Sequence, residues 1–279
     1  MSLFKSTLQR VFLITRRLAI ALRSIARDCR QDRSVKSWPG SLIAWFSVML
    51  RSAQPPLEFL MIADRFAPFE DLARLLIPHT HAEKIDGSHD TSHLLRVWNN
   101  VCAIRDHEGG DARVLIAATL LHDCVSVEKN SPFRSSASRL AAARATDLLT
   151  EMGWDEESIA SVAHAIEAHS FSAQVTPLTL EAKILQDADR LDSLGMVGVA
   201  RVFYVSGRMG RFLYDPADPH AAQRPYDDKD FAVDHFHTKL LHLADGFQTA
   251  TGASLAKVRH ERLKRYLEEL MEEIGAPFT

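Results

Sequence analysis

Val114-Leu-Ile-Ala-Ala-Thr-Leu-Leu-His-Asp123 is the stretch of this sequence that decides the fold. The part before His122 is apolar almost throughout, and a helix that is apolar on all sides is expected to run through the core of a globular domain. The run ends in an imidazole and a carboxylate, which are costly to bury unless both find partners. A divalent cation satisfies both groups at once, and the partial negative charge of a helix C-terminus favours that cation further.

The His122-Asp123 pair alone does not decide between a metal site and a structural role. In the structural role, His122 donates a hydrogen bond to a backbone carbonyl and Asp123 pairs with an arginine. This motif alone favours neither arrangement over the other. The decision depends on what other segments of the chain bring to the same place.

The chain from about residue 57 onward repeats apolar residues at intervals of three and four, and it has few of the alternating β-branched runs that are typical of strands. We therefore predict an all-α fold, a helical bundle of about eight to nine helices in a domain over residues 61–279. The irregular stretch 209–228 contains three prolines and is expected to be either a lid or a plain connector. The predicted helices lie at about 66–77, 91–106, 111–124, 136–152, 155–169, 179–187, 191–207, 229–247 and 252–274.

Residues 1–60 differ in composition from the rest and are predicted to form a basic N-terminal extension. The first 55 residues hold ten Lys or Arg and two Asp or Glu. No uninterrupted apolar run reaches the roughly 18 to 20 residues that span a bilayer. The extension is interpreted as a segment that contacts a membrane surface or directs targeting, or as a poorly ordered stretch from a gene start placed too early, with Met49 or Met61 as the true start.

The bulk composition excludes some classes of function. A formal net charge of -3 gives no global basic field, so no nucleic-acid partner is expected. The three cysteines, Cys29, Cys102 and Cys124, share no close spacing, which argues against a zinc knuckle or a disulfide framework and favours a cytoplasmic location.

Two further segments bring metal-binding side chains. His93 lies in the first turn of a predicted helix, with Arg96 on the same face. Far downstream, Ile184-Leu-Gln-Asp-Ala-Asp-Arg-Leu-Asp-Ser-Leu194 places Asp187, Asp189 and Asp192 in an apolar frame. Carboxylates this close repel one another unless cations intervene. All three could lie at the surface, but the apolar residues around them indicate a mostly buried helix, so at least one carboxylate is expected to point inward.

Taken together, the three segments resemble the HD superfamily of metal-dependent phosphohydrolases, whose signature is a His, a His-Asp pair and a distant Asp on separate helices. The likeness is greatest to the small bacterial stand-alone HD hydrolases, some of which cleave nucleoside triphosphates. It covers about residues 66–275 and leaves the first 60 unmatched. The segments that carry it are His93-x-x-Arg96-Val97, His122-Asp123 and Asp187-Ala-Asp189-Arg190-Leu-Asp192, together with Glu128-Lys-Asn-Ser-Pro132, Ile166-Glu-Ala-His169-Ser-Phe and Asp234-His235-Phe236.

The resemblance implies one divalent metal ion, bound by His93, His122, Asp123 and Asp189. Two imidazoles and two carboxylates leave positions for water on a six-coordinate ion, which suits manganese, iron, cobalt, nickel or magnesium. Such an ion lowers the pKa of its water towards neutrality and polarises a phosphoryl oxygen. The expected substrate is a small phosphorylated molecule, a nucleotide first of all.

Other polar residues near these motifs receive supporting roles. His169 matches the resembled pattern and is a candidate second-metal ligand, proton donor or phosphate contact, whereas His164 is interpreted as structural. Asp192 is a candidate for orienting a water or a ligand. The candidate substrate-binding residues are Arg96, Lys129, Arg190 and His235.

Two other functions remain open on the sequence. A di-iron oxygenase of the same architecture needs two further histidines, which His164 and His169 supply in number but with a poor spacing on one helix. A catalytically silent module that senses a nucleotide is the second alternative, although it has less need of an open metal position.

Overall fold

The computed structural model describes residues 61–80, 90–125, 136–170, 173–276 and 278. The chain divides into two units, Met1–Met61 and Ile62–Thr279, and all helices discussed below belong to the second. The whole of the predicted N-terminal extension, residues 1–60, lies outside the described residues, so its role stays a prediction.

The described part is helical and contains no strand, apart from one isolated bridge between Phe212 and Phe231. This confirms the predicted all-α class. None of the helices in the described ranges is long and apolar enough to cross a membrane. In chain order the elements are η2 (Asp64–Phe66), α4 (Glu70–Leu76), η3 (Ile77–His79), α5 (Thr91–Glu108), α6 (Ala112–Leu121), α7 (Ala137–Glu151), α8 (Glu156–His169), α9 (Leu180–Leu191), α10 (Gly195–Arg208), α11 (Asp234–Thr238), η6 (Leu240–His242) and α12 (Ala250–Glu273).

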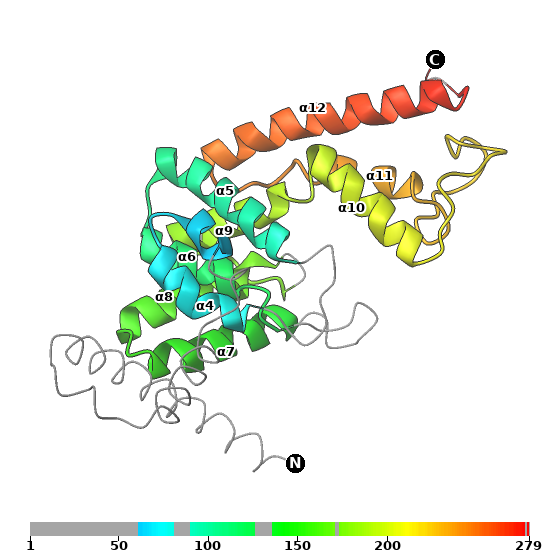
Figure 1. Ribbon diagram of the computed structural model, residues 1–279. Helices are drawn as coiled ribbons and strands as arrows, with labels where there is room; N and C mark the ends of the chain where they lie inside the picture. Colours follow the sequence, from blue (N-terminus) through cyan, green and yellow to red (C-terminus); the bar gives the residue numbers. More distant parts are fainter. Residues whose placement is uncertain (1–60, 81–89, 126–135, 171–172, 277, 279) are drawn as a thin grey trace, which may run out of the picture. The chain divides into compact units, whose positions relative to one another are not determined.

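Helix α6 lies in the centre of the core, as its apolar sequence predicts. Every residue from Val114 to Leu121 is buried. It packs mainly against α4, α5, α8 and α9, with a smaller contact to α7, and α5 and α9 also pack on each other (Figure 1). The C-terminal end of α6 is therefore surrounded by other helices, which is where the His-Asp pair follows.

Aspartate caps fix where the helices around the core begin. Asp90 accepts hydrogen bonds from the backbone amides of Ser92 and His93 at the start of α5. Asp111 caps α6 in the same way. An N-cap satisfies amides that have no partner within the helix, and its loss costs about 1 kcal/mol. The Asp90 cap therefore holds His93 in the first turn of α5.

Helices α10, α11 and α12 share a second apolar cluster, whose members include Val199, Phe236 and Leu263. The irregular segment between α10 and α11 is tied to it by ion pairs. The buried carboxylate of Asp234 pairs with Arg224 and accepts from the amide of Asp227.

The prediction of a single helix over 229–247 is wrong, because only α11 and the short η6 form in that range. Lys239 has φ -140° and ψ -59°, which breaks the helix, and Gly246 has a positive φ of 72°. The apolar residues of this range have a helix-like spacing in the sequence, but they pack on the second apolar cluster from short turns.

The boundary between the two helices around the acidic segment also differs from the prediction. Helix α9 continues to Leu191 instead of ending near 187, and α10 begins at Gly195. Gly195 has φ +65°, a conformation that favours glycine, so the chain turns there. All three aspartates of the motif consequently lie on α9 or at its C-cap.

Asp187 joins α9 to the start of α12. Its buried carboxylate accepts hydrogen bonds from the amides of Gln248 and Thr249 and from the Thr249 hydroxyl. Gly252, in the first turn of α12, packs directly against this carboxylate. A side chain at Gly252 would collide with Asp187 Oδ2 and Thr249 Oγ1, which these hydrogen bonds hold in place.

We expect Gly252→Ala to destabilise the fold by about 1–3 kcal/mol, because the added methyl overpacks this joint. Gly207→Ala is the matched control, since Gly207 also lies in a helix and nothing lies within 4 Å of an added Cβ. That change should be neutral or stabilising by up to about 1 kcal/mol. Urea unfolding of both variants measures the difference, and equal stabilities would contradict the close packing at Asp187.

Candidate metal centre

Three helices deliver the predicted ligands to one place. His93 comes from the first turn of α5, His122 and Asp123 follow the last turn of α6, and Asp189 lies in the last turn of α9. One ligand atom from each of His93, His122 and Asp123 lies within 4.8 Å of the others. Residues 96 positions apart in the sequence thus meet at the end of the central helix.

The hydrogen bond of His122 assigns its tautomer. Its Nδ1 lies 2.8 Å from the backbone oxygen of Thr119, and a carbonyl can only accept, so Nδ1 carries the proton. The lone pair of Nε2 then points towards the cluster. The purely structural role proposed for His122 also involves a hydrogen bond to a backbone carbonyl. That bond occupies only Nδ1, the ring nitrogen that faces away from the cluster.

His93 is held in the same manner by a carboxylate. Its Nδ1 lies 2.8 Å from Asp192 Oδ2, and both side chains are almost fully buried. Burial lowers the pKa of His93, but the hydrogen bond to Asp192 and the charges of Asp189 and Asp123 outweigh it, so the pKa is raised. For His122 burial dominates and its pKa is lowered.

The two imidazoles approach each other as ligands of one ion do. Their Nε2 atoms are 3.3 Å apart. Two nitrogens at about 2.1 Å from one ion lie about 3.0 Å apart at a right angle and about 3.4 Å apart at the tetrahedral angle. The observed separation falls between these values, so the two histidines fit a cation between them.

Carboxylates from two helices complete the cluster. Asp123 Oδ2 lies 3.8 Å from His93 Nε2 and 3.6 Å from His122 Nε2. Asp189 Oδ1 lies 3.5 Å and 3.9 Å from the same two nitrogens. The Asp123 and Asp189 side chains are 36% and 30% exposed, whereas the histidines are buried. The cluster is therefore closed on the histidine side and open to solvent on the carboxylate side.

Asp189 and Asp187 have different partners, although they lie only two residues apart. Asp187 is engaged by Gln248 and Thr249, and its burial raises its pKa. Asp189 faces the histidines. The chemistry of the donor set, two imidazoles and two carboxylates, fits a divalent ion with further positions for water or substrate.

Asp192 is the centre of an ion-pair network beside the cluster. Besides His93, its carboxylate accepts from Arg96 Nε at 2.6 Å and from Arg201 Nη1 at 2.9 Å. Burial opposes its ionisation, but the hydrogen bonds from His93 and Arg96 and the charge of Arg201 lower its pKa to about 2. Two guanidinium groups share this one carboxylate, so the network keeps an excess of positive charge.

Arg201 is a residue that the sequence analysis missed. It lies on α10, outside every motif, and only the packing of α10 brings it to Asp192. Arg96 was predicted to contact phosphate. Its side chain bonds Asp192 and Ser92 and is 32% exposed, so its place beside the cluster is clear and its substrate contact stays a prediction.

His169 lies at the edge of the cluster. Its ring centroid is 4.9 Å from that of His122, and its Nε2 is 3.9 Å from Asp123 Oδ1. Its Nδ1 lies 2.6 Å from the carbonyl oxygen of Ile166 and therefore carries the proton. His164, in contrast, accepts a hydrogen bond from the amide of Leu178 through Nε2.

The remaining substrate-binding candidates have different surroundings. Arg190 donates to the carbonyl oxygen of Gly246 and lies 5.2 Å from the ring of Phe247. His235 bonds Asp228 Oδ2 at 2.8 Å in the irregular segment before α11, and no contact to the cluster is found for it among the described residues. Lys129 lies outside the described residues.

Comparison with known proteins places these residues in a family. Residues 91–194 match the model of the HD domain, a range that holds all four predicted ligands. The chain is 33% identical over 190 residues to the YpgQ protein of Bacillus subtilis (strain 168), which corresponds to 67% of this chain and 84% of that protein.

Solved structures give the same result. An HD-superfamily hydrolase from Bacillus thuringiensis is 30% identical, with a TM-score of 0.58 over 74% of this chain and 98% of that one. The crystal structure of Bacillus subtilis YpgQ in complex with ADP is 31% identical, with a TM-score of 0.56 over 72% of this chain and 96% of that one.

We predict that Asp192→Asn destabilises the metal-free protein in a pH-dependent way. The pKa of Asp192 is lowered from 3.8 to about 2 by folding, so its contribution is present above the unfolded value and is lost as the pH falls through the folded one. The ionised Asp192 carboxylate should add about 2 kcal/mol to the free energy of unfolding of wild type relative to the variant. This pH-dependent contribution should be complete above about pH 5 and be lost as the pH falls to about 2 and below. Urea unfolding at several pH values measures it, and a difference that does not change over this range would refute the ion-pair network.

Proposed function

The chain belongs to the HD superfamily, and from this premise we propose that it is a metal-dependent phosphohydrolase that acts on a nucleotide. The observation that carries the proposal is the pair of Nε2 atoms, 3.3 Å apart, whose other ring nitrogens are both hydrogen-bonded away from the cluster. Such a pair, with two carboxylates next to it, is arranged to hold a cation.

His93, His122, Asp123 and Asp189 would hold a divalent ion such as manganese, nickel, cobalt, iron or magnesium. The bound ion supplies an activated water at neutral pH and polarises a phosphoryl oxygen. The exposed side of Asp123 and Asp189 is where a substrate has room to approach.

The protein side chains around the cluster have separate tasks. Asp192 keeps the proton of His93 on Nδ1, and a hydrogen-bonded ligand of this kind orients the imidazole. His169 has its Nε2 beside Asp123, so this atom is placed to accept a proton from water or from the substrate. Arg96 and Arg201 supply positive charge next to the cluster, which favours phosphate oxygens.

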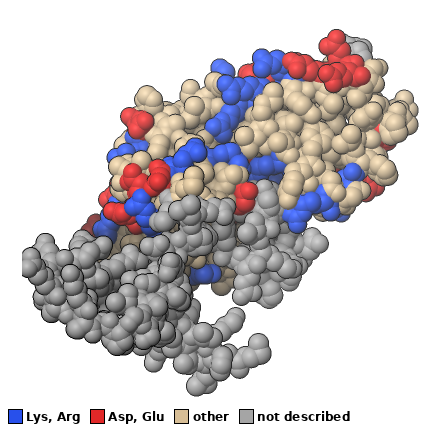
Figure 2. All heavy atoms as spheres, viewed as in Figure 1, with Lys and Arg blue, Asp and Glu red and all other residues tan. Residues whose placement is uncertain are grey.

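Two observations support a nucleotide as the substrate. YpgQ, which is 31% identical, was crystallised in complex with ADP. In addition, basic side chains form a broken band across the middle of the face shown in Figure 2, although the chain as a whole carries a formal net charge of -3. Local positive charge of this kind can attract a small polyanion without making the protein a nucleic-acid binder.

The geometry argues against the di-iron oxygenase. That function needs both His164 and His169 as ligands, whereas the Nε2 of His164 is occupied by the amide of Leu178. A silent nucleotide sensor has no need for carboxylate ligands with an exposed side. We therefore prefer hydrolysis to both alternatives.

We expect Asp189→Asn to impair metal binding and activity, and Asp187→Asn to impair stability. Asp189→Asn should lower metal content and phosphate release by about 100-fold or more, because removal of a ligand weakens the site, while the fold is retained. Asp187→Asn should bind metal normally but lower the melting temperature, because it weakens the joint to α12. Metal analysis, thermal unfolding and release of phosphate or pyrophosphate from nucleotides measure the three effects. If Asp187→Asn loses the metal and Asp189→Asn does not, the assigned ligand set is wrong.

The function itself is tested by removing the metal. Treatment with a chelator should abolish phosphate release, and adding back manganese, nickel, cobalt or magnesium should restore it in wild type but not in His122→Ala or Asp123→Ala. Wild type that is equally active with and without metal, or that consumes oxygen with two irons per chain, would overturn the proposal.

A further inference from the structure

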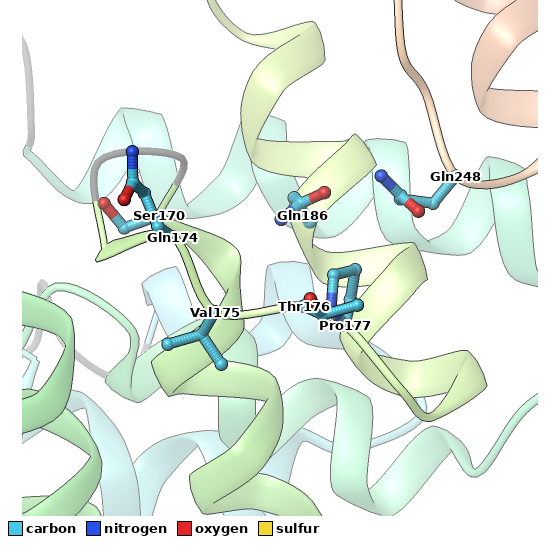
Figure 3. A pocket seen from close by; sticks show the side chains of 7 residues that line it. All are labelled: Ser170, Gln174, Val175, Thr176, Pro177, Gln186 and Gln248. Carbon is cyan, nitrogen blue, oxygen red and sulfur yellow. The ribbon is translucent and has the colours of Figure 1, made fainter.

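A cavity of about 300 Å³ opens beside α9 and is separate from the metal ligands. Its walls come from Ser170 at the end of α8, from residues 174–177 ahead of α9, from the middle of α9 and from the segment before α12 (Figure 3). The volume is at the lower end of the range for small-molecule sites, enough for one part of a ligand. The lining residues are Ser170, Gln174, Val175, Thr176, Pro177, Gln186 and Gln248.

None of the described residues that line this cavity carries a charged side chain. Its polar groups are two hydroxyls and the amides of three glutamines, and Val175 and Pro177 add apolar surface. Amides offer a donor and an acceptor side by side, which is the pattern that hydrogen-bonds to the edge of a nucleobase. A phosphate group, in contrast, would find no cationic side chain among these described lining residues.

One of these amides is held in a fixed orientation. Gln186 is 8% exposed, and its Nε2 donates to the carbonyl oxygen of Ala168 at 2.7 Å. Its amide oxygen therefore remains as the acceptor, and Figure 3 shows this oxygen on the side of Gln248. An acceptor held in place opposite a second amide is a preorganised recognition element.

Two segments of the chain connect the lining of the cavity to the candidate metal centre. Ser170 follows His169 directly, and His169 lies 3.9 Å from Asp123. Gln186 precedes Asp189 by three residues on α9, a rise of about 5 Å along the helix axis. A ligand whose phosphates lie at the cluster can thus place a neutral group in the cavity.

We propose that this cavity binds the nucleobase of the substrate, with Gln174, Gln186 and Gln248 as the residues that recognise it. The proposal rests on the proposed function and deepens it, because it separates two subsites. The cluster of His93, His122, Asp123 and Asp189 takes the phosphates, and the amide-lined cavity takes the uncharged end of the nucleotide.

The test compares two non-hydrolysable probes that share the same phosphonates and differ only in the nucleoside. They are adenosine 5′-(α,β-methylene)diphosphate and methylenediphosphonate, titrated calorimetrically into the full chain with manganese present. Gln174→Ala and Gln248→Ala are suitable variants because both residues line the cavity and are exposed, so truncation of either side chain is expected to retain the fold. Gln223→Ala is the matched control, an exposed glutamine outside the cavity.

We expect Gln174→Ala and Gln248→Ala each to weaken binding of the adenosine probe about three- to tenfold, the effect of losing one hydrogen bond. Binding of methylenediphosphonate should stay within about twofold of wild type, and Gln223→Ala should change neither affinity. Wild type should bind the adenosine probe more tightly than methylenediphosphonate.

The outcomes separate the two proposals. If wild type binds both probes equally, or if Gln174→Ala and Gln248→Ala weaken both to the same extent, the cavity is no base subsite while the phosphohydrolase proposal stands. If the adenosine probe binds without manganese as well as with it and wild type releases no phosphate from nucleotides, the phosphohydrolase proposal fails while the base subsite stands. If wild type binds neither probe, both proposals are wrong.

Discussion

The buried carboxylate of Asp192 holds together the helices that form the candidate metal centre. It accepts hydrogen bonds from His93 and Arg96 on α5 and from Arg201 on α10, so one side chain at the end of α9 connects three helices. An unpaired buried carboxylate would be costly, and these partners hold its pKa near 2. The orientation of His93 follows directly from this network. The geometry of the cluster thus depends on a residue that is not itself among the predicted ligands.

Helix α9 supplies three carboxylates with three different tasks because of its 3.6-residue period. Asp187 and Asp189 are two positions apart and point in nearly opposite directions, one to the start of α12 and the other to the histidines. Asp192 follows three residues later at the C-cap, back towards the side of Asp189, and there it meets α5 and α10. One short acidic motif can therefore connect α9 to α12 and also supply carboxylates to the candidate site, because these carboxylates do not face one another.

The sequence predicted those parts of the molecule that local patterns encode. The apolar run 114–121 gave the central helix, and the ordered His and Asp motifs gave the residues that converge. Helix 229–247 was predicted wrongly because its spacing reflects packing of short turns on the second apolar cluster. Arg201 and the amide-lined cavity could not be predicted, because both depend on how α9 packs against its neighbours.

The charges around the centre explain why a cation and a polyanion would bind together. Asp123, Asp189 and Asp192 outnumber Arg96 and Arg201 by one, so with neutral imidazoles, the form that binds a cation, these side chains carry a net negative charge. A divalent cation makes this net charge positive. Because the site is partly buried, charges there are screened less than in bulk water. In the proposed function, a positive field for the phosphates of a nucleotide would therefore arise only once the ion is bound, whereas the uncharged cavity would not be affected by this change. Affinity for the phosphates should be coupled to the metal, whereas recognition of the uncharged end should not.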